Sequence, residues 1–173
     1  MKLLTRSHIS QLVKDNKLVL ISTDNQGITF LDEVRIGLRL GEEITEVLAP
    51  VCLNDTATPR TQKQKTTSAL LIPGHLYLCP SSERFSLPNN VMGVISTRSK
   101  YARLGFELAK SSVYVAPGFG SKEPTPLVFE ITVPLEVSGI STNICYGFLL
   151  LIEIDDHLEH GSVSYNSRFP FDR

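Results

Sequence analysis

The stretch STRSKYARLG, residues 96–105, concentrates the side chains of this sequence that are best suited to bind an anion. It carries Arg98, Lys100 and Arg103, with the hydroxyl of Ser99 between the first two, and it follows an apolar run typical of a strand. Guanidinium groups bind phosphate oxygens in pairs, and hydroxyls can donate to the oxygens that remain. A solvated turn has the same composition. The stretch alone therefore supports two interpretations, a phosphate-binding segment and an exposed polar turn.

A second candidate for chemistry is a single carboxylate inside an apolar run. Glu130 lies between Phe129 and Ile131 in LVFEITV, residues 127–133, where apolar side chains alternate as in a half-buried strand. Burying a carboxylate is costly unless it is paired or functional. Two interpretations stay open here: Glu130 lies on the solvated face of an antiparallel sheet, or it carries out chemistry in a partly desolvated site.

Other motifs either place a turn or exclude a class of site. Pro117–Gly120 predicts a tight turn where backbone can approach a ligand closely. Phosphate-binding loops, dinucleotide-binding glycine motifs, zinc-protease motifs and nucleophile elbows are all missing from the sequence. The H-x-E and P-C-x-x-C motifs of zinc-dependent nucleobase deaminases are missing too, so any deamination must work without zinc. His157 and His160 have a metal-compatible spacing, but their charged surroundings favour a solvated turn.

The composition of the chain limits the kinds of partner and the cellular compartment that we expect for it. The chain has 173 residues, 42% of them apolar, and a net charge of −1, which predicts one folded domain without the global basic surface that binds polymeric nucleic acid. Its apolar runs are too short to span a membrane, and its first residues lack the apolar core of a signal peptide. Cys52, Cys79 and Cys145 are widely spaced, as expected of buried thiols rather than zinc ligands. We expect a cytoplasmic protein.

Short strands must position these residues. One helix is predicted over residues 5–16, with Thr5 or Ser7 as cap and Asn16 as stop. Strands are predicted at 17–22, 34–41, 75–80, 91–97, 127–133 and 147–154, the last one buried on both faces. Polar residues at 54–68 predict a flexible loop, and 157–173 a C-terminal tail. The pattern predicts a single all-β domain over residues 1–173, of the sandwich or barrel type.

The order of these segments resembles the dCTP deaminase branch of the deoxyuridine triphosphatase (dUTPase) superfamily. Residues 70–105, LLIPGHLYLCPSSERFSLPNNVMGVISTRSKYARLG, are similar to its P-G-x-x-x-L, E-x-x-x-L-P and G-R-S-S-x-A-R-x-G motifs. Residues 114–120, YVAPGFG, resemble its I-D-P-G-W turn, and LVFEITV resembles the strand that carries its catalytic glutamate. Residues 3–20 resemble the family's opening helix and first strand, residues 34–44 its S-x-D-L-R-L-G strand, and residues 146–154 its P-G-M-x-I-x-x-L strand. Six segments thus occur in the family's order along nearly the whole chain.

The resemblance implies a fold and an activity. The fold would be a distorted jelly-roll-like barrel of the dUTPase type with a short N-terminal helix, assembled as a homotrimer with active sites between subunits. The activity would be zinc-independent hydrolytic deamination of a pyrimidine deoxynucleotide, most simply dCTP to dUTP and ammonia. Mg²⁺ would arrive with the nucleotide triphosphate and need no protein cage of its own.

The resemblance also assigns roles to residues. Glu130 would be the general base and proton shuttle, a role that needs a carboxylate in a partly desolvated site. Ser99 and Arg103 would position the attacking water or the triphosphate, and Ala102 would pack beneath the nucleotide. The nucleotide-binding residues would be Arg98, Ser99, Lys100, Arg103, Ser111, Ser112, Tyr114, Tyr165 and Arg168.

The sequence departs from the family's motifs at several of these places. Gly37 and Ala116 stand where the motifs have aspartate, Tyr114 stands for an arginine, segment 121–126 is longer and the tail after Tyr165 is shorter. Alanine accepts no proton, so Ala116 argues against deoxyuridine triphosphatase chemistry. Two alternatives to dCTP deamination stay open: a relative that acts on another pyrimidine nucleotide, and a trimeric nucleotide-binding or structural protein that has lost the chemistry.

Overall fold

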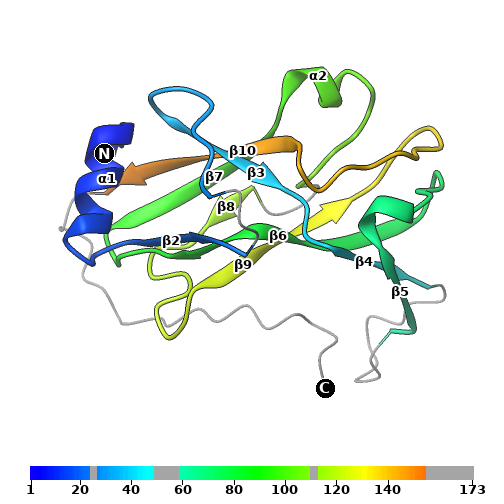
Figure 1. Cartoon of the computed structure of the whole chain (residues 1–173), viewed down its shortest axis with the longest axis horizontal. Coiled ribbons are helices and arrows are strands. Elements are labelled where there is room, and N and C mark those ends of the chain that lie inside the picture. The colour runs from blue at the N-terminus through cyan, green and yellow to red at the C-terminus, as the bar shows by residue number, and fades with distance from the viewer. Residues whose placement is uncertain (24–26, 49–58, 110–112, 155–173) are drawn as a thin grey trace.

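The computed structural model describes residues 1–23, 27–48, 59–109 and 113–154 (Figure 1). Its elements are β1 (Lys2–Leu3), α1 (Arg6–Lys14), β2 (Val19–Ser22), β3 (Arg35–Arg39), β4 (Glu43–Val47), β5 (Thr61–Lys65), the 3-10 turn η1 (Thr66–Ser68), β6 (Leu76–Ser86), β7 (Val91–Thr97), α2 (Ser99–Ala102), β8 (Tyr114–Val115), β9 (Thr125–Ile131) and β10 (Cys145–Glu153). In this part of the chain, no helix is long and apolar enough to cross a membrane.

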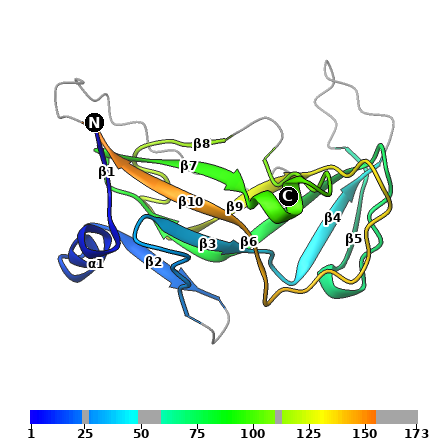
Figure 2. The same cartoon turned by 90° about the horizontal axis from the view of Figure 1, so that it is seen from above.

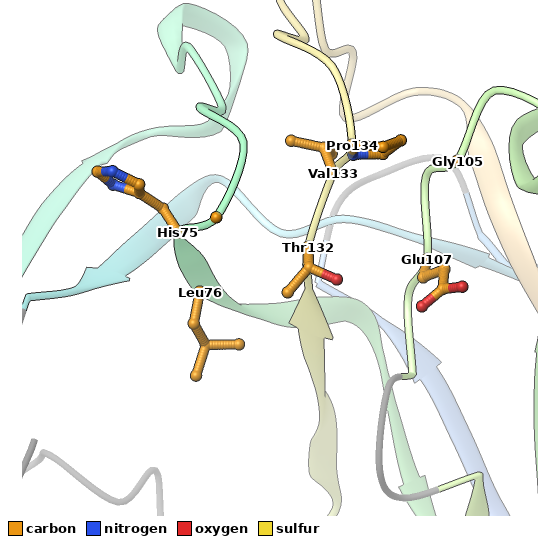
Figure 3. A pocket seen from close by; sticks show the side chains of 8 residues that line it. His75, Leu76, Gly105, Glu107, Thr132, Val133 and Pro134 are labelled. Carbon is orange, nitrogen blue, oxygen red and sulfur yellow. The ribbon is translucent and has the colours of Figure 1, made fainter.

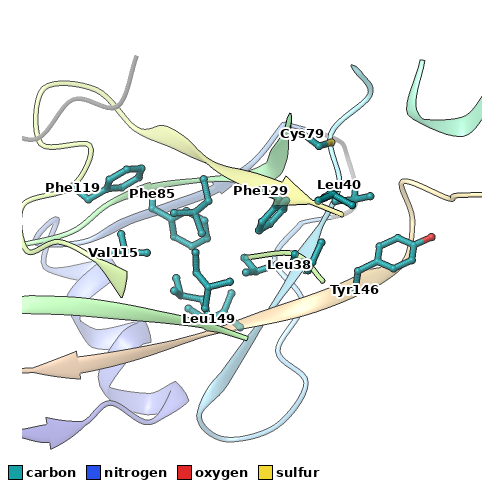
Figure 4. Packing of buried hydrophobic residues seen from close by; sticks show 14 of the residues in the cluster. Leu38, Leu40, Cys79, Phe85, Val115, Phe119, Phe129, Tyr146 and Leu149 are labelled. Carbon is teal, nitrogen blue, oxygen red and sulfur yellow. The ribbon is translucent and has the colours of Figure 1, made fainter. Parts of the chain in front are cut away.

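The described strands form two antiparallel sheets of five strands each (Figures 1 and 2). The β10 sheet has the order β1-β10-β7-β8, with β3 also on β10, and the β6 sheet has the order β2-β6-β4-β5, with β9 also on β6. Leu38 and Leu149 of the β10 sheet are buried in one core with Phe85 and Phe129 of the β6 sheet (Figure 4). The predicted all-β class, with two sheets packed on one core, is thereby confirmed.

Helix α1 forms where the apolar period predicts it. Ile9 is buried, and the hydroxyl of Thr5, the N-cap, is hydrogen-bonded to Nδ1 of His8 at 2.8 Å. Asn16 adopts a left-handed backbone with φ of 54°, a conformation that asparagine tolerates and that stops a helix. The helix predicted over residues 5–16 is confirmed, with its observed bounds slightly inside the predicted ones.

Strand β6 extends well beyond the predicted 75–80, through a polar sequence. Ser81, Ser82 and Glu83 are all buried. Their polar groups find partners inside the protein: Ser81 Oγ accepts the Leu127 amide at 2.9 Å, and Ser82 Oγ donates to the Leu40 carbonyl at 2.9 Å. The alternation rule fails here because these polar side chains are satisfied within the core.

The predicted loop at 54–68 is wrong over its second half. Residues 61–65 form β5, which pairs with β4, and residues 66–68 form η1, while residues 54–58 lie outside the described residues. The sequence of β5 predicts a loop because β5 is an edge strand with mostly polar side chains. Lys63 and Lys65 are exposed on it, as is common on edges that must not pair with another chain.

Strand β10 is covered unequally on its two faces, unlike the prediction of burial on both. Leu149 and Leu151 are buried in the core, whereas Phe148 and Leu150 on the opposite face are only half-buried. The sequence of β10 is continuously apolar, but its side chains alternate between buried and half-buried as in an ordinary strand. The predicted tail at 157–173, with His157 and His160, lies outside the described residues.

Two of the three cysteines are free, buried thiols, as predicted, and Cys52 lies outside the described residues. Burial raises the pKa of the Cys79 thiol to about 12, and it also raises the pKa of Cys145. Because the thiolate is the reactive form, both thiols are expected to be unreactive in the folded chain.

Candidate nucleotide site

The basic stretch at residues 96–105 forms the end of β7 and the single helical turn α2. Arg98 is the N-cap of this turn, and its carbonyl accepts the Ala102 amide at 3.0 Å. Its own amide donates to the Tyr146 carbonyl at 2.8 Å, and its guanidinium donates to the Cys145 carbonyl at 3.1 Å. Gly105 closes the stretch with a positive φ of 75°. Arg98 is therefore half-buried and fixed on the start of β10.

The other polar side chains of the turn face outward. Ser99, Lys100 and Arg103 are all exposed, and the ammonium of Lys100 lies 5.6 Å from the ring centroid of Tyr101. One fixed guanidinium beside two exposed cations and a hydroxyl is suited to bind the oxygens of a phosphate group. The alternative of a plain solvated turn accounts for the exposed residues but not for the anchored Arg98.

Glu130 lies on the face of β9 that points away from the core. Phe129 and Ile131 are buried on the core side, as the alternation predicts, and Glu130 is half-buried on the other side, with Leu78 of β6 opposite it. The segment around Leu108 lies alongside β9, and the carbonyl of Leu108 accepts the Glu130 amide at 3.1 Å. Glu130 is thus neither a core residue nor a fully solvated one.

A short path of hydrogen bonds joins the basic stretch to Glu130. The amide of Leu108 donates to the hydroxyl of Thr97 at 3.1 Å, and the carbonyl of Leu108 accepts the amide of Glu130 at 3.1 Å. The predicted phosphate segment and the predicted base are therefore connected through one residue. Sequence reasoning missed Thr97, although its hydroxyl stands next to the first arginine of the stretch.

The predicted turn at Pro117–Gly120 packs against the protein itself. Gly118 and Gly120 have positive φ values of 76° and 68°, and a Cβ on Gly120 would lie 2.1 Å from the carbonyl oxygen of Phe85. The close backbone approach predicted there is thus to β6, because both glycines are buried. Tyr114 precedes this turn on β8 and is 66% exposed.

Four predicted nucleotide-binding residues lie outside the described residues: Ser111, Ser112, Tyr165 and Arg168. The structure therefore places Arg98, Ser99, Lys100, Arg103, Tyr114 and Glu130. The basic residues belong to one turn, Glu130 is joined to that turn through Leu108, and Tyr114 lies opposite Val94 at the edge of the β10 sheet.

A groove of about 500 Å³ borders this region (Figure 3). Its lining residues are Gly74, His75, Leu76, Gly105, Glu107, Thr132, Val133 and Pro134. Gly105 ends the basic stretch and Thr132 follows Glu130 by two residues, yet of the predicted catalytic and phosphate-binding residues that the structure describes, none lines the groove. In a single chain these residues thus lie on a surface beside the groove rather than within it.

Sequence reasoning also missed a buried ion pair that joins the two sheets. Arg39 of β3 is 1% exposed and Glu83 of β6 is 0% exposed, and the Arg39 Nε donates to Glu83 Oε1 at 2.8 Å. Burial raises the pKa of the Glu83 carboxyl, and hydrogen bonds from the Arg39 amide and guanidinium offset part of that rise. The signal was available, since Arg39 lies between two leucines just as Glu130 lies between apolar neighbours.

One departure from the family's motifs has a steric counterpart. A Cβ on Gly37 would lie 2.6 Å from the Sγ of Cys145, so the thiol fills the space that any side chain at position 37 would need. The carboxylate of the motif cannot return here without displacing Cys145. Among the described residues, no group of three or more His, Cys, Asp and Glu side chains could hold a metal ion.

Comparisons with known proteins identify relatives. The dUMP-forming dCTP deaminase of Methanospirillum hungatei is 32% identical over 90 residues, which cover 49% of this chain and 48% of that protein. The dCTP deaminase of Buchnera aphidicola subsp. Baizongia pistaciae is 28% identical over 172 residues, which cover 90% of this chain and 84% of that protein. The match thus spans about half the length of the first relative and most of the second.

A solved structure agrees with the observed fold. The 2'-deoxycytidine 5'-triphosphate deaminase from Agrobacterium tumefaciens is similar with a TM-score of 0.62 over 87% of this chain and 48% of that chain, at 19% identity. At this identity the likeness shows the fold alone. A family model described as dCTP deaminase-like matches residues 3–139. Since that match covers well over half of the chain, the chain belongs to the dCTP deaminase-like family.

Proposed function

We propose that this chain deaminates a pyrimidine deoxynucleotide by hydrolysis without zinc, most simply converting dCTP to dUTP and ammonia. The observation that carries the proposal is the path from the basic turn through Leu108 to Glu130. It joins the backbone of a half-buried glutamate to the strand end that precedes an anchored arginine, in a chain of the dCTP deaminase-like family. These are the groups that an acid–base reaction on a phosphorylated substrate requires.

In the proposed reaction, Glu130 takes a proton from water. The hydroxide attacks C4 of the cytosine ring, so that a C4–O bond forms. Glu130 gives this proton to ring nitrogen N3 as the hydroxide adds. It then takes the proton of the new C4 hydroxyl and passes it to the amino group, the C4–N bond breaks, and ammonia leaves as the C4 carbonyl of uracil forms. Arg98 and Arg103 hold phosphate oxygens during these steps, and Mg²⁺ arrives bound to the triphosphate and shares its charge.

We further propose that the active site forms between subunits of a homotrimer. Three observations support this assembly: the outward-facing cations of α2, the location of Glu130 outside the groove, and large apolar side chains that a single chain leaves exposed. Leu104 is 64% exposed beside Arg103, and Leu135 is 68% exposed. A neighbouring subunit would cover such apolar surface and enclose the basic turn.

Two other functions remain as candidates, because the base side of the site has changed. Tyr114 and Ala116 are exposed and uncharged where the family's motifs have arginine and aspartate. This change favours either a different pyrimidine nucleotide or a protein that binds nucleotides without turning them over.

Ammonia release tests the proposal against these candidates. Purified protein with Mg²⁺ is offered dCTP, dCMP, dUTP and CTP, the products are identified by chromatography, and the assembly is sized by light scattering. Ammonia from dCTP is the expected result, and ammonia from another substrate alone would reassign the substrate. A folded protein that releases no ammonia from any of them would contradict the deaminase and favour the binding or structural alternative.

The Arg103→Ala variant is expected to bind the triphosphate about tenfold more weakly, because it loses a charge-assisted hydrogen bond at an exposed position. Binding of deoxycytidine, which has no phosphate, is expected to stay unchanged. Calorimetric titration of both ligands measures this difference. Lys14→Ala, which removes an exposed cation from α1, is the control. Equal losses of affinity for the nucleoside and the triphosphate would exclude the phosphate role.

A further inference from the structure

Leu108 makes contacts that join both sheets beside Glu130. Its side chain packs over Gly147 of β10, where an added Cβ would lie 2.5 Å from Leu108 Cδ1. Its amide donates to Thr97 of β7, and its carbonyl accepts the amide of Glu130 on β9. Leu108 is 0% exposed. The backbone of Glu130 is therefore positioned by a residue that is itself held by the β10 sheet.

The segment that contains Leu108 is held by buried side chains and by a few hydrogen bonds, and Phe106 and Leu108 both pack in the core. Residues 106–109 form no named strand, and isolated bridges pair Glu107 with Thr132 and Ala109 with Glu130. The Thr97 hydroxyl provides a side-chain hydrogen bond from the end of β7 to this segment, at 3.1 Å. This bond therefore ties the backbone of the segment to a side chain of β7.

We propose that Thr97 is a positioning residue for the reaction, which acts through Leu108 to fix Glu130 relative to the basic turn. The inference rests on the proposed function for its catalytic consequence. Thr97 immediately precedes Arg98, so the same strand end places the phosphate-binding arginine and, through one hydrogen bond, the base.

The Thr97 hydroxyl distinguishes this sequence from the motif that the stretch resembles. The motif that the stretch resembles, G-R-S-S, has glycine where this chain has Thr97 in TRSK. Glycine has no side-chain oxygen, so it cannot accept a side-chain hydrogen bond from the Leu108 amide. The chain thus carries a side-chain bond between its phosphate segment and Glu130 that the motif does not provide.

The Thr97→Val variant tests the proposal, because valine keeps the branched shape of threonine and removes the acceptor. We expect kcat to fall about tenfold with KM within about twofold, since a displaced base slows the chemical step more than it weakens binding. Thr97→Ser keeps a hydroxyl and is expected to restore kcat to near the wild-type value. Unchanged kcat in Thr97→Val, or an equal loss in Thr97→Ser, would overturn the positioning role.

Amide hydrogen exchange separates this inference from the proposed function. If the wild-type chain releases no ammonia, the deaminase proposal fails, and exchange at Leu108 and Glu130 then decides the structural part. Both amides should exchange faster in Thr97→Val than in Thr97→Ser, while core amides such as Leu38 stay protected. If Thr97→Val does not fold, Thr97→Gly replaces it. Unchanged exchange at both amides would overturn the inference.

Discussion

The Glu130→Gln variant is expected to lose deamination by about 10³-fold while it remains folded and binds nucleotide. An amide is nearly the same size as a carboxylate but cannot take up the proton of the attacking water. The side chain lies on the half-buried outer face of β9, so the core behind Phe129 and Ile131 is untouched. The backbone bond from position 130 to Leu108 is also retained, because it involves the amide nitrogen of the main chain.

A matched control is available on the neighbouring segment. Glu107 is exposed, pairs with Thr132 and lines the groove, and no role in the reaction is proposed for it. Glu107→Gln removes the same negative charge close to the same strand and is expected to keep wild-type turnover. Ammonia release from dCTP, compared at saturating substrate for both variants, measures the difference.

Two outcomes would contradict the role of Glu130. Turnover by Glu130→Gln would show that another group activates the water. An equal loss in Glu107→Gln would show that local charge, rather than proton transfer at position 130, controls the rate. A nucleotide-binding protein without chemistry predicts a third pattern, in which the wild-type chain and both variants bind nucleotide alike and none releases ammonia.

Local sequence signals were sufficient where one face of an element is apolar. The helix at α1, the strand at β7 and the alternation around Glu130 were all predictable, because burial against a single core imposes a period on the residues. The outward position of Glu130 follows from the same period. The basic stretch was recognisable from its residue types, although only the structure shows that Arg98 is anchored while Arg103 is exposed.

The features that were missed depend on residues far apart in the sequence. Strand β5 has no apolar period, since it exists only as the polar edge of β4. The bond from Thr97 to Leu108 needs the chain to reverse through α2, and nothing in the stretch itself predicts it. Arg39 and Glu83 are 44 residues apart, so Arg39 looks like an isolated charge in an apolar strand and Glu83 looks like part of an ordinary polar stretch. Ion pairing between two sheets depends on the tertiary structure, so the apolar period of a single strand cannot predict it.

The Arg39→Met variant is expected to lose about 3–5 kcal/mol of the free energy of unfolding at pH 7, because it leaves the Glu83 carboxylate buried without its counter-charge. The Arg39 guanidinium also donates hydrogen bonds to the Ser22 hydroxyl and to the Gly27 carbonyl, and the variant removes both of these bonds. For a chain of this size the loss corresponds to a melting temperature lower by about 10 °C. Urea unfolding followed by circular dichroism measures it.

Arg35→Met on the same strand is the matched control. Arg35 pairs with Asp32 at the surface, at 2.6 Å, and both side chains are more than a third exposed. Water solvates the charge left behind, so the stability loss is expected to be a small fraction of that for Arg39→Met. A double variant, Arg39→Met with Glu83→Leu, removes both buried charges and is expected to be more stable than Arg39→Met alone.

The free energy of unfolding that Arg39→Met loses should also depend on pH, and the burial of Glu83 determines whether this loss grows or shrinks as the pH rises. Burial raises the pKa of Glu83 above 4.5, and removing the hydrogen bonds from Arg39 raises it further. A carboxyl whose pKa is higher in the folded chain contributes stability below its unfolded pKa and loses it as pH rises through the folded pKa. The deficit relative to wild type should therefore grow from pH 4.5 toward neutral pH. A deficit that is equal at pH 5 and pH 8 would show that lost packing, rather than an unpaired buried charge, destabilises the variant.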